Sequence, residues 1–296
     1  MNYNHLLKQS KLAFLFILCA SFSAKLFGQN KSIVSDVFFS GGTILMDNPR
    51  FNNAELLLLA PNSQLLNANL EKFRPSNSIY GYSGTQGATS FSAQIGINPI
   101  KSDVKKSVSP LLRIGITMGQ VNQVNEYLSY ADRFPYDTLI SQRTGEKIFL
   151  DSVAGSQMNI NQSGNQIRLN IALIYQTDLE RRISVYSGVE VGAGLTFNNT
   201  TQITKSEFHQ GTDFNSFFYG GHSNFQWENF TNKNGYLAQA SIPIGFNLRL
   251  SKQKPLLNQA LLYLEFSPGL AYYHIPEVKS LANFTYQTNV GLRFRI

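Results

Sequence analysis

The sequence of 296 residues predicts an all-β protein, an antiparallel up-and-down β-barrel that crosses a membrane with eight strands, ten being the alternative. The first observation is the stretch 182–197, where every second residue is apolar apart from Ser187. Alternation of this length is typical of a β-strand. The second observation is that glycines fall on the polar faces of the predicted strands. The third is that the connections between strands alternate between long and short, as in membrane barrels.

The glycines indicate which face of each strand points inward. They share the polar parity of their strands: Gly96, Gly115, Gly119, Gly188, Gly192, Gly194, Gly245, Gly269 and Gly291. A small barrel has little room inside, so glycines there let long side chains cross the axis. The apolar faces then meet lipid. A soluble barrel of the lipocalin kind, with its apolar face inward, is the alternative, and the glycine positions argue against it.

Composition agrees with an exported membrane barrel. Charged residues make up 15% of the chain, against roughly 25% in soluble proteins. The net charge is +7, but the Lys and Arg residues are scattered, so nucleic acid is not an expected partner. Residues 1–28 predict a cleaved secretory signal, with Lys8 and Lys11 before the apolar stretch 12–20. The only cysteine, Cys19, would leave with it.

The mature chain, 29–296, is expected to form one barrel domain. The weakest strand candidate is 31–46, and short helices are expected at 53–59 and 63–73. The regular strands are expected at 90–98, 112–119, 166–176, 182–197, 236–250, 262–272 and 284–296. Pro243 and Pro268 each remove a ladder donor, so a local bulge is expected where their strands meet.

Two long polar excursions, 121–163 and 198–234, are expected to be extracellular loops. The first contains an apparent hairpin, 137–142 against 147–153, that turns at Thr144-Gly145. Aromatic residues end the apolar faces: Phe91, Phe197, Tyr236, Tyr272 and Phe284 at one end, Tyr175 and Phe294 at the other. This is the pattern of the aromatic girdles of membrane barrels.

Charged residues on the inward parity predict an ion-pair network that plugs the lumen. The expected members are Arg113, Arg168, Glu190, Arg249, Glu265 and Arg293. A tight turn at 178–180 would place Arg168 opposite Glu190, and a hairpin centred near Lys279 would place Glu265 opposite Arg293. Unpaired buried charges are too costly, so we expect these residues to bridge across the lumen. The alternative is that they line a wet channel.

The sequence indicates no catalytic, cofactor-binding or metal site. The mature histidines, His209, His222 and His274, lie in predicted outer segments without the spacing of metal ligands or of a catalytic group. The segment 208–230 is rich in aromatic residues, and Phe217, Phe218, Tyr219 and Trp227 are the candidates for contact with a ligand or partner. The alternative is a loop that packs on itself and covers the barrel.

The final strand carries a resemblance. Val290, Leu292, Phe294 and Ile296 alternate to the last position, although an aromatic residue would be the usual end. With the signal and the topology, the chain resembles small outer-membrane barrels of the OmpA/OmpX type and the PorT-like families. This resemblance implies a place in the bacterial outer membrane and cell envelope, but it does not imply one activity.

We therefore expect a non-enzymatic barrel with a structural or interaction role through its extracellular loops. The expected partners are outer-membrane lipid and either another envelope protein or an extracellular ligand. The alternatives are a narrow pore for small solutes and a component of a secretion machine. An enzyme that acts on lipid has the least support.

Overall fold

The computed structural model describes residues 34–47, 49–75, 85–98, 108–210, 222–251 and 259–296. The expected signal, 1–28, and the aromatics Phe217, Phe218 and Tyr219 lie outside the described residues. The elements are β1 (Val34–Asp47), α2 (Asn53–Leu59), α3 (Gln64–Asn69), the 3-10 turn η1 (Leu70–Lys72), β2 (Arg74–Pro75), β3 (Thr85–Ile97), β4 (Val108–Ile140), β5 (Lys147–Thr177), β6 (Ile183–Gln210), β7 (His222–Thr231), β8 (Gly235–Ser241), β9 (Ile244–Arg249), β10 (Ala260–Ile275) and β11 (Lys279–Arg295).

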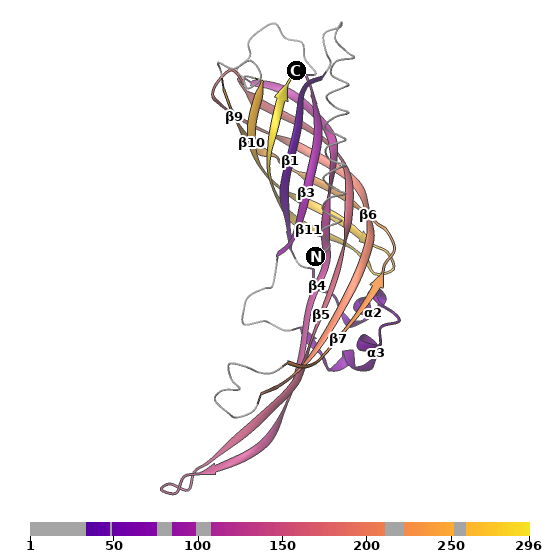
Figure 1. Ribbon diagram of the computed structural model, residues 1–296, viewed down its shortest axis with the longest axis vertical. Helices are drawn as coiled ribbons and strands as arrows, with labels where there is room; N and C mark the ends of the chain where they lie inside the picture. The colour runs from indigo at the N-terminus through magenta and orange to yellow at the C-terminus, as the bar shows by residue number, and fades with distance from the viewer. Residues whose placement is uncertain (1–33, 48, 76–84, 99–107, 211–221, 252–258) are drawn as a thin grey trace.

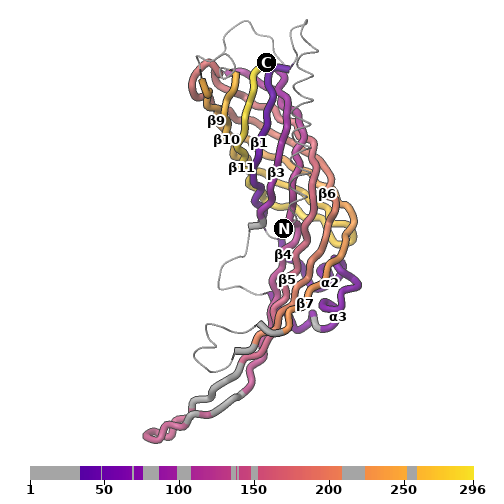
Figure 2. Tube along the Cα trace, viewed as in Figure 1, coloured from indigo at the N-terminus to yellow at the C-terminus, as the bar shows by residue number. Residues whose placement is uncertain are grey.

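The described strands close into a ring of eight antiparallel positions (Figures 1 and 2). The strand β1 pairs with β3 on one side and with β11 on the other, which closes the barrel. Around the ring follow β4, β5, β6, then β8 and β9 as one position, then β10. The prediction of eight strands is confirmed, and the doubtful first segment is a full barrel strand. No helix in the described part of the chain is long and apolar enough to cross a membrane.

The polar face of the barrel points inward. Inward residues such as Arg168 and Asn247 are buried, whereas outward residues such as Phe91, Val189 and Leu195 are 58–67% exposed. An exposed apolar belt around a polar interior excludes the soluble, lipocalin-like arrangement. The girdle residues Tyr175 and Tyr236 are also exposed on the outside. A closed barrel with an even number of strands and this belt is the architecture of bacterial outer-membrane proteins.

One glycine shows why the inward face needs residues without side chains. A Cβ on Gly192 would lie 2.4 Å from Oδ1 of Asn170 and 2.9 Å from Cδ of Arg168. The space beside Gly192 is therefore the space that the Arg168 side chain occupies as it enters the lumen.

The bulge expected at Pro243 and Pro268 is not formed. Ser241 pairs with Glu190 and Ile244 pairs with Ser187, so both strands advance by three residues and the register is unchanged. The pairing with β10 is equally regular. Gly188 N donates to Pro243 O at 3.1 Å, but proline has no N–H to return the bond. Each proline thus leaves out one hydrogen bond of the ladder. This break separates β8 from β9, and no extra residue is inserted there.

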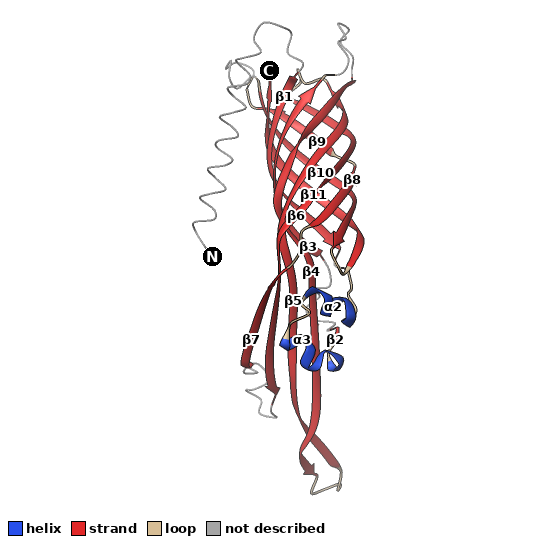
Figure 3. Ribbon diagram, turned by 90° about the vertical axis from the view of Figure 1, so that its right-hand side faces the viewer, coloured by secondary structure: helices blue, strands red, loops and turns tan. Residues whose placement is uncertain are grey.

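Three strands continue far beyond the barrel. The β3–β4 pairing ends at Ser90 and Gly119, whereas β4 and β5 pair as far as Ile140 and Lys147. The predicted hairpin is confirmed as the tip of these strands, and Gly145 adopts a positive φ in its turn. We call residues 120–163 of β4 and β5, residues 198–210 of β6 and the strand β7 the extension (Figure 3).

Most of the two ranges expected as loops is therefore strand. Register shifts at Gln123 on β4 and at Asn198–Asn199 on β6, opposite Gly164 of β5, explain why the alternation is hard to see in the sequence. Each shift inserts a residue and reverses the parity of the inward face, as a β-bulge does. On β4, for example, Val121 and Val124 are both buried.

Both predicted helices are confirmed, at 53–59 and 64–69. Asn52 and Glu55 form a reciprocal capping box at the start of α2, and Ser63 accepts a hydrogen bond from Leu66 N at the start of α3. We call residues 49–75 the helix module. It lies against one side of the extension, next to the mouth of the barrel (Figure 3).

Candidate functional site

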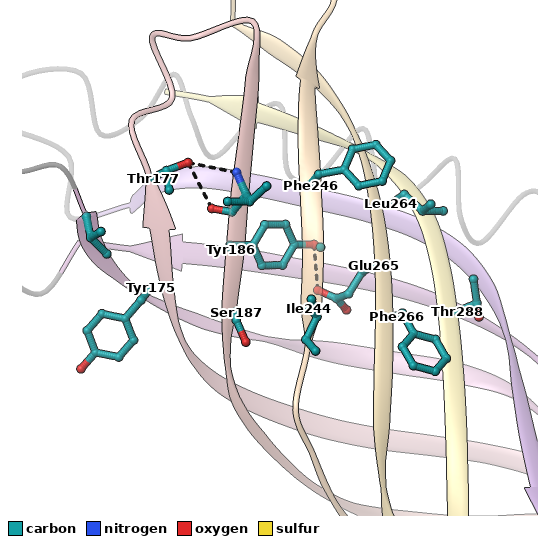
Figure 4. Close-up of a pocket in the computed structure, with 13 residues that line it drawn as sticks. Tyr175, Thr177, Tyr186, Ser187, Ile244, Phe246, Leu264, Glu265, Phe266 and Thr288 are labelled. Atoms are coloured by element: carbon teal, nitrogen blue, oxygen red, sulfur yellow. Dashed lines mark hydrogen bonds between the residues drawn. The ribbon is translucent and has the colours of Figure 1, made fainter.

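The centre of the lumen holds an arginine between two glutamates. Arg113 on β4 donates to Glu190 on β6 at 2.9 Å and to Glu265 on β10 at 2.6 Å. The three residues are between 2% and 8% exposed. Glu265 also accepts a hydrogen bond from the Tyr186 hydroxyl at 2.9 Å (Figure 4) and one from the Asn289 amide at 3.2 Å. These additional donors satisfy the second carboxylate, as a buried charge requires.

The pairing within this network differs from the expected one. Glu190 lies opposite Ala172, not Arg168, and Glu265 lies opposite Asn289, not Arg293. In each case the predicted register was wrong by four residues, because the centre of the turn lies two residues from the predicted position. The second hairpin centres on Glu277, which has a positive φ of 66° in the turn.

Arg293 pairs with a carboxylate that sequence reasoning missed. Its Nε donates to Asp36 at 2.8 Å, and its Nη1 donates to Gln176 at 2.7 Å. Both guanidinium groups lie over the Phe38 ring, with the Cζ of Arg293 4.9 Å and the Cζ of Arg113 5.7 Å from the ring centroid. Asp36 and Phe38 share an inward parity, so a firm assignment of the first strand would have identified both.

Arg168 and Arg249 contribute in other ways. Arg168 donates to Asn170 at 2.7 Å, to Gln287 at 3.1 Å and to Gln239, all of them neutral amides. Arg249 lies at the end of the barrel near the chain's C-terminus, where it contacts Leu179 O at 2.5 Å and Glu180 at 3.3 Å. The six predicted residues therefore form a central triad, two separate arginine sites and one pair at the rim.

The rim pair includes an exposed carboxylate. Glu180 accepts hydrogen bonds from Arg249 and, at 3.0 Å, from Arg295. The hydrogen bond from Arg295 is the main cause that lowers the pKa of Glu180, and the charges of both arginines act in the same direction. This carboxylate is thus held in its ionised form at the short-turn end of the barrel.

Apolar layers lie on both sides of the lumen network. One contains Phe38, Leu111, Ala172, Ile174, Tyr186 and Tyr263, and the other contains Ile44, Met46, Ala88, Val121, Leu237, Ala271 and Tyr273. All of these side chains are less than 5% exposed. A side chain that bordered a water-filled channel would be exposed to it. The described lumen is therefore filled by side chains, as an eight-stranded barrel permits.

The helix module covers the inner side of the extension. Leu56, Leu59 and Leu66 of the helices pack with Met158 and Ile203 of the strands in one buried apolar cluster. Glu228 on β7 accepts hydrogen bonds from Ser63 Oγ at 2.5 Å and from Gln64 N at 3.2 Å. The carboxylate thereby binds the beginning of α3 to the sheet.

Three further polar contacts attach the module to Lys279 at the barrel mouth and to Glu126 in the extension. Lys279 Nζ contacts Glu55 at 2.7 Å and donates to Arg50 O at 2.8 Å. Phe51 N donates to the buried carboxylate of Glu126 at 3.0 Å. Burial raises the pKa of Glu126, and the hydrogen bond from Phe51 acts against this shift. The module is therefore attached at several points along its length.

The predicted aromatic contact residue that the structure describes, Trp227, is 61% exposed on β7. Phe225, on the same strand, is 67% exposed. Of the histidines, His274 stacks on Tyr236 with ring centroids 4.4 Å apart, and its Nδ1 lies 3.0 Å from Ser280 Oγ. No carboxylate contact with the His274 ring is seen among the described residues, and these residues contain no cluster of metal-ligating side chains.

A shallow groove of about 560 Å³ lies on the lipid-facing wall where β6, β9 and β10 meet (Figure 4). Outward side chains such as Ile244, Phe246 and Phe266 line it, and Gly245 leaves the Tyr186 ring at its floor. Its lining is almost entirely apolar, as is the rest of the lipid-facing wall.

No protein-family model matches the sequence, and comparison with curated proteins finds no match. Among solved structures, the chain is similar to Neisserial surface protein A, with 12% identity over 88% of this chain and 97% of that chain and a TM-score of 0.27. It is also similar to Ail, the attachment invasion locus protein of Yersinia pestis, with 9% identity over 88% and 99% and a TM-score of 0.22. With such low TM-scores, no functional property is transferred from these proteins to this chain.

Proposed function

We propose that the protein is a non-enzymatic outer-membrane β-barrel that acts through its extension, which contacts another molecule outside the membrane. The observation that carries this proposal is the continuity of β4, β5 and β6 from the barrel wall into the extension. The sheet is supported by the helix module, so it is a preorganised surface and not a set of loose loops.

The extension is assigned to the cell exterior by the lengths of the connections. The barrel end near the C-terminus carries the tight 178–182 turn, and the extension leaves from the opposite end (Figure 1). Bacterial barrels have short periplasmic turns and longer outer segments. By the same rule, the start of β1 and the end of β11 lie on the periplasmic side.

The filled lumen argues against the pore as the second candidate. Solute passage would require the Arg113 triad and both apolar layers to move aside together. A component of a secretion machine is a variant of the proposed function, in which the contacted molecule is another envelope protein.

Two measurements on the mature chain test the proposal. Planar-bilayer recordings should show no stable single-channel conductance. A photo-crosslinking residue placed at Tyr127 on the extension should form a defined adduct on intact cells, whereas the same residue at Val189 in the lipid-facing belt should label lipid. Large ohmic steps, or equal labelling at both positions, would overturn the proposal in favour of a pore or of a barrel without an outer contact.

A further inference from the structure

The outer face of the extension, opposite the helix module, carries one row of side chains across four strands. Tyr127 on β4 pairs with Asn159 on β5, Asn159 pairs with Thr204 on β6, and Thr204 pairs with Trp227 on β7. The row thus has an amide and a hydroxyl in the middle and an exposed aromatic residue at each end. With strands about 4.8 Å apart, three strand spacings separate the aromatic residues by about 14 Å.

The neighbouring row is also polar. Asn125, Asn161, Gln202 and Asn229 are consecutive cross-strand partners on the same four strands. None of the residues in these two rows is charged. The opposite face of the same strands differs. Glu126 and Glu228 lie there and accept hydrogen bonds from the helix module, and Lys205 lies on the same face, 3.6 Å from Glu207. Around these two rows the outer face is therefore polar and uncharged.

This chemistry suits a saccharide better than a protein or an ion. Amides and hydroxyls both donate and accept hydrogen bonds, as sugar hydroxyls do. Aromatic rings present a large apolar surface at a low entropic cost, and they can cover the apolar face of a sugar ring. A phosphate-bearing ligand would call for arginine or lysine, which these rows lack.

The position of the face identifies the source of the saccharide. The rows continue the lipid-facing side of the same strands: toward the barrel, Asn161 is followed by Ile167 on β5, and Gln202 is preceded by Leu195 on β6. Both apolar residues point outward, and Leu195 is 58% exposed. The surface therefore changes from apolar to amide-rich along the outer wall, as it passes from the acyl-chain layer into the headgroup layer.

We propose that this face binds the uncharged saccharide portion of glycolipids in the leaflet around the barrel. The inference rests on the proposed function, because it requires the extension to lie on the glycolipid side of the membrane. The glycolipid headgroups would hold the extension at a fixed angle to the membrane, with Tyr127 and Trp227 as the two ends of the contact.

The chain offers an intrinsic reporter, because Trp227 is its only tryptophan. The mature protein is placed in nanodiscs of three kinds: phospholipid alone, phospholipid with a glycolipid that bears a neutral oligosaccharide, and phospholipid with the same glycolipid stripped of its sugars. Trp227 emission and its quenching by iodide are measured in each. We expect a blue shift and an approximately tenfold loss of quenching only with the sugar-bearing glycolipid.

Matched variants then locate the contact. Asn159→Val and Thr204→Val remove the polar groups of the central row but keep strand-forming residues, and each should weaken the response by about three- to tenfold. Gln226→Ala, an exposed residue of opposite parity on β7, should leave it unchanged. Heat-modifiable mobility on a gel shows that each variant is folded.

The outcomes separate this inference from the proposed function. An equal response to sugar-stripped glycolipid, or no response, overturns the saccharide site. The free oligosaccharide is also added to the nanodiscs of phospholipid alone, and a response only in that sample overturns the assignment to membrane glycolipid. A protein that shows none of these responses, conducts no ions and still crosslinks through Tyr127 would retain the proposed function and lose this inference alone.

Discussion

Replacement of Arg113 by methionine is the most direct test of the filled lumen. Arg113→Met removes the cation that lies within 2.9 Å of Glu190 and within 2.6 Å of Glu265. Both carboxylates stay buried, and they would face each other without a counter-charge. Breaking a buried ion pair by removing one partner costs about 3–5 kcal/mol of the free energy of unfolding. Because two carboxylates lose their partner here, we expect the upper part of that range.

This loss should be visible in a denaturant titration. With a slope of about 1–3 kcal/mol per molar urea, a loss of 3–5 kcal/mol lowers the unfolding midpoint by about 1–5 M. The folded barrel and the unfolded chain run differently on an unheated gel, so the folded fraction can be read at each urea concentration. Arg182→Met, at an exposed position in the turn between β5 and β6, is the matched control and should leave the midpoint unchanged.

A second variant separates charge from packing. Arg113→Met combined with Glu190→Gln and Glu265→Gln leaves no uncompensated charge, and it should recover most of the lost stability. If Arg113→Met alone costs less than about 1 kcal/mol, the value typical of exposed pairs, then water reaches the triad. The lumen would then be wet, and the argument against a pore would fail.

Three further results are expected. Leu56→Ala, in the buried cluster of the helix module, should cost about 2–5 kcal/mol locally and admit protease to residues 49–75, whereas Leu58→Ala, on the exposed side of α2, should not; equal cleavage would mean that the module is not docked. Glu180 has a lowered pKa in the folded state, so its stabilising effect is present above pH 4.5 and is lost as the pH falls through the lower value. Glu180→Gln should therefore lose part of the acid dependence of the urea midpoint, and an unchanged profile would refute the rim pair. On intact cells an impermeant maleimide should label Thr144→Cys and spare Asp178→Cys; the reverse would invert the topology.

The barrel strands could be predicted from the sequence because their two environments differ sharply. Residues that alternate between lipid and a polar lumen carry a clear period of two, and the glycines mark the inward side. The extension lacks this contrast. Its outer face is polar, and the bulges at Gln123 on β4 and at Asn198–Asn199 on β6 reverse the parity within those two strands, so regular pairing in the structure corresponds to an irregular pattern in the sequence.

The lumen shows a different limit of sequence reasoning. Parity identified six charged residues that point inward and missed Asp36. Cross-strand pairing could not identify the partners of the six. Arg113, Glu190 and Glu265 lie on β4, β6 and β10, which are not neighbours in the sheet. Their contacts cross the lumen, so they depend on the closure of the ring and on the shear of the barrel. A single turn length determines only the register of two adjacent strands, and an error of two residues in its centre moves each partner by four. The pairing of the lumen charges is therefore a property of the closed barrel, whereas their inward position is a property of each strand alone.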